Sequence, residues 1–91
     1  MRTESVIVYS DQSNAPVLQH PGRKFPGLLV QGDTLYAMCV QADEACAEAS
    51  QGGTFEELED LRSRLWDLLD HYKSVLGTHG IPLPFTDRDE K

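Results

Sequence analysis

The chain has 91 residues, of which 40% are hydrophobic and 25% are charged. This length predicts one small globular domain. Fifteen Asp and Glu against eight Lys and Arg give a formal net charge of −7, which argues against nucleic acid as a ligand because nucleic-acid binders normally carry a basic face. The chain contains neither a signal-peptide pattern nor an apolar run of about 20 residues that would span a bilayer. We therefore expect a cytoplasmic protein with no membrane or nucleic-acid partner.

Three short apolar runs in the first third of the chain predict strands. Residues 5–10 (SVIVYS) are rich in β-branched and aromatic side chains, and residues 15–19 (APVLQ) follow a polar cluster of turn-forming residues. These two runs predict a β-hairpin. A loop over residues 20–27 with two Pro-Gly steps then leads to a third strand at residues 28–31 (LLVQ), whose continuous apolar character predicts burial.

A first helix is predicted from Asp33 or Thr34, because either side chain can accept hydrogen bonds from the free N–H groups of the first turn. Small apolar residues recur at three- and four-residue spacing, which predicts one buried stripe; they are Leu35, Met38, Cys39, Ala42, Ala45, Cys46 and Ala49. The two cysteines lie two helical turns apart, too far for a mutual disulfide. We expect both to act as small buried hydrophobic residues.

A second, longer helix follows the break at Gly52-Gly53. Thr54 and Glu57 form a capping box at its start, and Gly77 or Gly80 is expected to end it. Apolar residues again recur on one stripe: Phe55, Leu58, Leu61, Leu65, Leu68, Tyr72, Val75 and Leu76. This stripe either faces the core of the protein or forms the interface of a helix-mediated dimer.

These elements predict an α+β fold in the order β-β-β-α-α, with a small antiparallel sheet of about three strands and a helical hairpin, one helix of which packs on the sheet. We expect a single domain over residues 1–85 and a disordered tail over residues 86–91. Residues 81–85 (IPLPF) cannot form regular helix or a central strand. They are either a cover for the open end of the core or a partner-binding patch.

No pattern of catalytic, cofactor-binding or metal-binding residues is found in the sequence. His20, His71 and His79 have no second ligand at a spacing typical of a metal site, and neither cysteine has a sequence cue for activation. There is no nucleophile elbow and no phosphate-binding glycine loop. We therefore expect neither an enzyme nor a cofactor nor a metal.

The candidate partner-binding residues lie in three places. Arg23, Lys24 and Phe25 combine positive charge with an aromatic ring in a stiff, proline-bracketed loop, which is otherwise an ordinary strand connection. Trp66 follows Arg62 by one helical turn and is either an interface anchor or a residue packed at the edge of the core. Asp43 and Glu44 belong to an acidic face of the first helix.

Part of the chain resembles a known family. The run Phe25-Pro26-Gly27, the turn at residues 31–35 (QGDTL), and Ala42 with Glu44-Ala45 resemble the N-terminal domain of HicB-type antitoxins, over residues 5–49. After this stretch the chain departs from that family, since a long helix takes the place of a further strand and no DNA-binding segment follows. The whole chain is also similar to small uncharacterised bacterial proteins of this length.

The resemblance and the charge together imply a function. They indicate a non-catalytic protein-binding module of antitoxin or immunity type, which presents an acidic surface to a basic partner such as a toxin. The alternative is a structural homodimer or a scaffold component of a larger complex.

Overall fold

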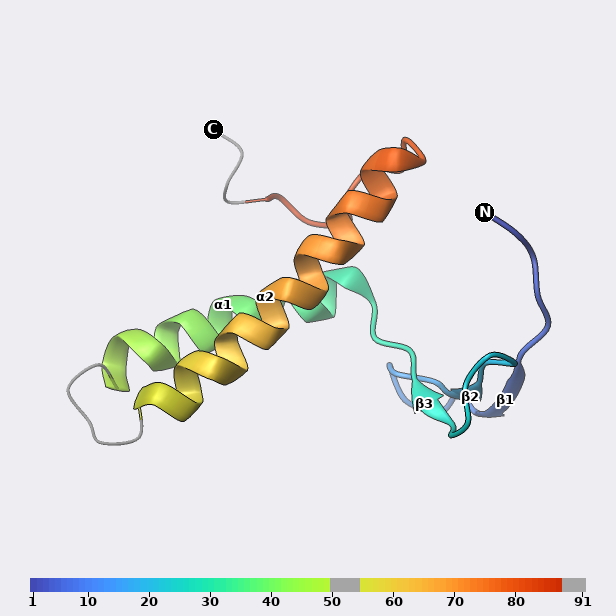
Figure 1. Ribbon diagram of the computed structural model, residues 1–91, viewed down its shortest axis with the longest axis horizontal. Coiled ribbons are helices and arrows are strands. Elements are labelled where there is room, and N and C mark those ends of the chain that lie inside the picture. Colours follow the sequence, from blue (N-terminus) through green and yellow to red (C-terminus); the bar gives the residue numbers. More distant parts are fainter. Residues whose placement is uncertain (50–54, 88–91) are drawn as a thin grey trace. The chain divides into compact units, whose positions relative to one another are not determined.

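The computed structural model describes residues 1–49 and 55–87 (Figure 1). As predicted, the fold is α+β, with a three-stranded antiparallel sheet followed by two helices. The chain divides into two compact units, Met1–Gln31 and Gly32–Lys91, and each is described by itself. The packing of a helix on the sheet and the single domain over residues 1–85 stay predictions.

The first unit is a sheet with the strand order β1-β2-β3. Strand β1 spans Ile7–Ser10, β2 spans Val17–Gln19 and β3 spans Gly27–Leu28. The predicted hairpin is confirmed, because β1 and β2 pair antiparallel, with Val8 opposite Leu18. Between Val8 and Ser10 the register shifts by a bulge, a local irregularity that increases the twist of a strand pair.

The third strand is shorter than predicted, and its own unit leaves it exposed. Pairing with β2 covers only Gly27 and Leu28, although the chain continues along β2 with a hydrogen bond from the Leu29 N–H to the Pro16 carbonyl (2.9 Å). Leu28 is 65% exposed, so the first unit by itself does not bury this strand, and its predicted burial stays a prediction together with the packing of a helix on the sheet. An apolar run predicts burial only where a second layer covers both faces, and within its own unit this short edge strand has no such layer.

The second unit is a helical hairpin. Helix α1 spans Gly32–Ala49 and α2 spans Phe55–Thr78, and the two helices pack against each other (Figure 1). Helix α1 begins one residue before the predicted Asp33, whose carboxylate accepts a hydrogen bond from the Thr34 N–H (2.9 Å). The predicted break at Gly52-Gly53 and the capping residue Thr54 lie outside the described residues.

The core of this unit lies between the two helices. Cys39, Ala42 and Cys46 are buried on α1, and Leu69 is buried on α2 with an exposed fraction of 0%. Both cysteines are buried, as predicted, and neither forms a disulfide. Their small side chains allow the α2 backbone to approach α1 closely, so that one leucine fills the space between the helices.

Of the two predicted roles of the α2 stripe, packing in the core does not hold for three of its residues within the helical unit. Leu61, Leu68 and Val75 are exposed, Leu68 by 59%, whereas the neighbouring Leu69 was not part of the predicted stripe. Leu69 follows Leu65 by four residues, so it also fits helical spacing. Successive helical residues point about 100° apart, and a contact with a single helix buries too narrow an arc for both leucines.

The C-terminal end of α2 is closed by Gly80, one of the two predicted glycines. Its φ angle of 67° lies in the left-handed region, which glycine adopts without strain. The Ile81 N–H donates to the Leu76 carbonyl (2.9 Å) and the Gly80 N–H to the Gly77 carbonyl (3.3 Å). This pair of hydrogen bonds is a Schellman motif, which satisfies carbonyl groups at the helix end and turns the chain back.

The start of α1 requires a glycine for another reason. Gly32 is buried, and a Cβ atom there would overlap the ring of Tyr72 on α2. The missing side chain therefore allows the tyrosine ring to lie directly on the α1 backbone. At Gly77, by contrast, a Cβ atom would meet nothing within 4 Å.

We predict opposite outcomes for truncation of the two neighbouring leucines. Leu69→Ala should lower the free energy of unfolding by about 2–5 kcal/mol, because it leaves a cavity between the helices. Leu68→Ala should change it by less than about 0.5 kcal/mol, because the side chain is mainly in solvent. Chemical denaturation followed by far-UV circular dichroism measures both values, and equal losses would contradict the assignment of the core to Leu69.

Two glycine-to-alanine changes provide a second test. Gly32→Ala should destabilise the protein by about 1–3 kcal/mol, because the new methyl group displaces the Tyr72 ring. Gly77→Ala adds the same methyl group inside α2 without a clash and should stabilise by up to about 1 kcal/mol, through the higher helix propensity of alanine. A thermal melt of each variant gives the sign, and shifts of the same sign would contradict the close approach at Gly32.

Candidate functional site

The residues predicted to bind a partner are divided between the two units. Arg23, Lys24 and Phe25 lie in the loop between β2 and β3, within the first unit. Asp43 and Glu44 lie on α1, and Trp66 lies on α2, within the second unit. The two groups are therefore two separate candidate surfaces.

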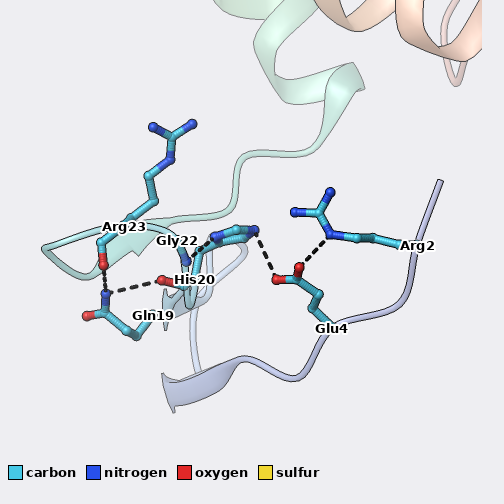
Figure 2. Close-up of polar contacts among 6 residues, drawn as sticks. All are labelled: Arg2, Glu4, Gln19, His20, Gly22 and Arg23. Atoms are coloured by element: carbon cyan, nitrogen blue, oxygen red, sulfur yellow. Dashed lines mark hydrogen bonds and ion pairs between the residues drawn. The ribbon is translucent and has the colours of Figure 1, made fainter.

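The loop of the first unit is held by its own polar groups (Figure 2). The Gln19 side-chain amide donates to the carbonyls of Arg23 (2.6 Å) and His20 (3.3 Å), and the Arg23 N–H donates to the His20 carbonyl (3.0 Å). The His20 Nδ1 atom accepts from the Gly22 N–H (2.9 Å). Four hydrogen bonds thus fix the backbone of a short loop, and the Arg23 side chain extends away from them (Figure 2).

Charge around this loop is partly compensated by one carboxylate. Glu4 pairs with the Arg2 guanidinium and lies 4.0 Å from Nε2 of His20 (Figure 2). Such exposed pairs contribute at most about 1 kcal/mol to stability. At the tip of the loop, the Lys24 ammonium lies 5.5 Å from the ring centroid of Phe25, a distance typical of a cation–π contact. The loop therefore presents a cation and an exposed aromatic ring together.

The second unit brings Trp66 and Asp43 together. The Trp66 indole N–H donates to the Asp43 carboxylate (3.0 Å), and Nε of Arg62 lies 3.8 Å from the same oxygen. Trp66 also packs its ring edge-to-face with Tyr36, at 6.4 Å and 87°. These contacts connect α1 to α2, so Trp66 and Asp43 join the helices of the hairpin. Glu44, next to Asp43 in the chain, is exposed.

The segment after α2 packs onto the same unit as a C-terminal strap, residues 81–87. Its Phe85 ring stacks on Tyr36 with centroids 4.4 Å apart and an interplanar angle of 9°. Further along, the carboxylate of Asp87 is buried and pairs with the Lys73 ammonium of α2 at 2.5 Å. Of the two predicted roles for residues 81–85, covering the core agrees with these contacts. The predicted disordered tail begins at residue 86, yet Asp87 is a packed part of the strap.

A shallow apolar hollow lies on the other side of the helix pair. Met38 and Leu61 are each five residues from Asp43 and Trp66, respectively, which places them about 140° away around their helices. The hollow has a volume of about 260 Å³. Its lining comes from both helices: Met38, Gln41, Ala42, Ala45, Leu58, Leu61 and Leu65. Sequence patterning placed most of these residues in the core and missed the hollow, which depends on how closely the helices approach.

Acidic residues surround the end of the hairpin next to this hollow. The sequence has no Lys or Arg between residues 25 and 61, and it has eight Asp and Glu there. Seven of these lie in the second half of α1 and the first two turns of α2, and we call this region the acidic hairpin end: Asp43, Glu44, Glu48, Glu56, Glu57, Glu59 and Asp60. Glu57 and Asp60 also line a second hollow, separate from the apolar one, together with Leu61 and Arg64.

Among residues 1–49 and 55–87, no group of three or more His, Cys, Asp and Glu side chains is arranged to hold a metal ion. Neither helix within these residues has the length and apolar character required to cross a membrane.

Comparison with known proteins gives one kind of match. The model of the family DUF6959, a family of unknown function, matches residues 1–85. No curated protein and no solved structure matches the chain. The resemblance of residues 5–49 to HicB-type antitoxins stays a prediction.

Removal of the strap aromatic tests how the C-terminal segment is held. Phe85→Ala should lower the free energy of unfolding by about 1–3 kcal/mol, because an aromatic pair contributes about 0.5–1.5 kcal/mol beyond the burial of its area. Thr86→Ala is the matched control, since Thr86 is exposed on the same strap. Denaturant melts compare the two, and a Phe85 variant as stable as the control would contradict a packed strap.

Proposed function

Because the chain belongs to DUF6959, a family of unknown function, we propose its role from its own surface: it is a non-catalytic protein-binding module that presents the acidic hairpin end to a basic partner protein. The role is of antitoxin or immunity type. The observation that carries the proposal is the apolar hollow of Met38, Leu58, Leu61 and Leu65 beside a concentration of carboxylates.

The charge of this surface favours a basic partner. Long-range attraction between an acidic patch and a basic one accelerates encounter and selects against partners of the wrong sign. Apart from Asp43, which is already bound by Trp66 and Arg62, the six other carboxylates of the acidic hairpin end repel phosphate groups and attract Lys and Arg side chains. Nucleic acid and anionic membranes are for this reason not the proposed ligands.

The hollow offers a partner protein an apolar contact, which a charged surface alone does not provide. Binding energy at protein interfaces is concentrated in a few buried apolar or aromatic side chains with a polar rim around them. Met38 and Leu61 are both exposed, although burial of each would stabilise the protein by about 1.5–3 kcal/mol. A partner segment with one large apolar residue flanked by cations fits this surface.

One acidic residue of this region, Glu48, lowers the stability of its own helix. Glu48 lies in the last turn of α1, which contains no basic residue. A negative charge there interacts unfavourably with the helix dipole, and such interactions amount to about 0.3–1 kcal/mol. Residues that lower stability often mark functional positions, so Glu48 supports a role for the acidic hairpin end outside folding.

The resemblance to HicB-type antitoxins supports a toxin as the basic partner, although the loop residues Arg23, Lys24 and Phe25 stay a second candidate contact. We place this binding in the cytoplasm, where Cys39 and Cys46, which form no disulfide, remain reduced.

A site-specific crosslinking experiment tests the proposal. A photo-reactive residue in place of Met38 lies in the hollow, and one in place of Ser63 is the control, since Ser63 is exposed on α2 about 160° around the helix from Leu61. In the native host, position 38 should capture a basic protein that position 63 does not, and added salt should reduce its recovery. Equal capture at both positions, or capture of an acidic protein, would contradict the proposal.

A charge reversal at Glu48 separates folding from binding. Glu48→Lys should raise the free energy of unfolding by about 0.5–1 kcal/mol through the helix dipole, and it should reduce crosslinking from position 38. Asp70→Lys makes the same change of charge at an exposed position of α2 outside the acidic hairpin end, and crosslinking should be affected less. Equal effects of the two variants would show that only the net charge matters.

A further inference from the structure

The turn that follows β2 is closed by an imidazole. Residues 20–23 (HPGR) form this turn, in which the Arg23 N–H donates to the His20 carbonyl (3.0 Å). The His20 side chain returns to the same turn, and its Nδ1 atom accepts a hydrogen bond from the Gly22 N–H at 2.9 Å (Figure 2). Asp and Asn ordinarily supply this contact, because their side-chain oxygens accept from the N–H two residues on. Here a ring nitrogen that can be protonated takes the place of that oxygen.

The geometry decides which ring nitrogen carries the proton of the neutral imidazole. Nδ1 accepts from a backbone N–H, so it holds a lone pair and the proton lies on Nε2. Nε2 is the nitrogen that faces the Glu4 carboxylate, at 4.0 Å. A Cβ atom on Gly22 would lie 3.3 Å from Cε1 and Nδ1 of His20. Glycine therefore allows the ring to lie closely on the turn.

We infer that His20 is a pH-sensitive cap of this turn: the neutral imidazole closes the turn, and protonation of Nδ1 opens it. The inference does not rest on the proposed function. In the imidazolium both ring nitrogens are donors, so the new Nδ1–H and the Gly22 N–H would point at each other. Two donors cannot remain at the 2.9 Å of the hydrogen bond, and the ring has to leave the Gly22 N–H.

Solvent and a neighbouring charge both allow this change. The His20 side chain is 47% exposed, so water reaches the ring, and histidine ordinarily changes charge between about pH 5 and pH 8. The charged groups next to it are Glu4, the Arg2 guanidinium that pairs with Glu4, and Arg23 of the same turn, whose side chain extends away (Figure 2). The Glu4 carboxylate attracts the imidazolium, so the ring has a second partner when it leaves Gly22.

The change is confined to the turn and to the residues that the turn carries. The Gln19 amide donates to the carbonyls of His20 (3.3 Å) and Arg23 (2.6 Å). Because an amide does not titrate, both ends of the turn stay attached to β2. Between these ends the Gly22 backbone is released, directly before the cation and the aromatic ring that the loop presents. The loop is therefore ordered while His20 is neutral and looser once it is charged.

Nuclear magnetic resonance of the ¹⁵N-labelled full chain tests the inference. At high pH the His20 Nδ1 resonance should be that of an unprotonated nitrogen, and the Gly22 amide should be protected from hydrogen exchange. As the pH falls from about 8 to about 5, the protection factor of Gly22 should fall about two- to tenfold, which corresponds to the loss of one hydrogen bond. A neutral ring protonated on Nδ1, or a Gly22 amide that does not change while His20 titrates, would overturn the inference.

Three variants separate the cap from other effects of pH. His20→Asn keeps an acceptor that does not titrate, so Gly22 should stay protected at both pH values, whereas His20→Ala should leave it poorly protected at both. Glu4→Gln should keep the transition, because the transition depends on the hydrogen bond from Gly22. Both side chains are exposed, so circular dichroism should show all variants folded. A transition that persists in His20→Asn, or that is lost in Glu4→Gln, would overturn the assignment to the Nδ1 atom.

Discussion

The structure of the helical unit depends on the close approach of α1 and α2 at a line of small side chains. Cys39, Ala42 and Cys46 occupy little volume, so the single leucine at position 69 fills the space between the helices. This approach also brings the indole of Trp66 within hydrogen-bonding distance of Asp43. A close but narrow contact fixes the geometry of two helices and buries few large apolar residues.

Because the contact between α1 and α2 is narrow, apolar side chains remain exposed on the outer faces of the two helices. A domain of about this size buries only about 60–65% of the surface of its unfolded chain, and here several large side chains remain on the exposed faces of the helices. The apolar hollow beside the acidic hairpin end is one place where that surface can be used, because it combines exposed apolar side chains with nearby carboxylates.

The sequence predicts the fold better than it predicts the surfaces. Alternating and β-branched residues located the hairpin of β1 and β2, and helical spacing with glycine located both helices, because these signals act over neighbouring residues. The choice between Leu68 and Leu69 depends on how two helices approach, which a single periodic pattern does not contain. The contact of Asp43 with Trp66, 23 residues apart, is likewise a product of tertiary packing. For Trp66 this contact agrees with the predicted packing at the edge of the core, whereas the structural role of Asp43 was not indicated by spacing.

The position of Trp66 has a spectroscopic consequence. It is the single tryptophan of the chain, and its indole spans the two helices through Asp43 and Tyr36. Its fluorescence therefore reports whether the hairpin is closed. The apolar hollow opens on the other side of the helices, so a molecule that binds there does not change the surroundings of the indole. Separation of the two helices, by contrast, exposes the indole to water. The protein thus carries an internal probe that distinguishes occupancy of its surface from opening of its core.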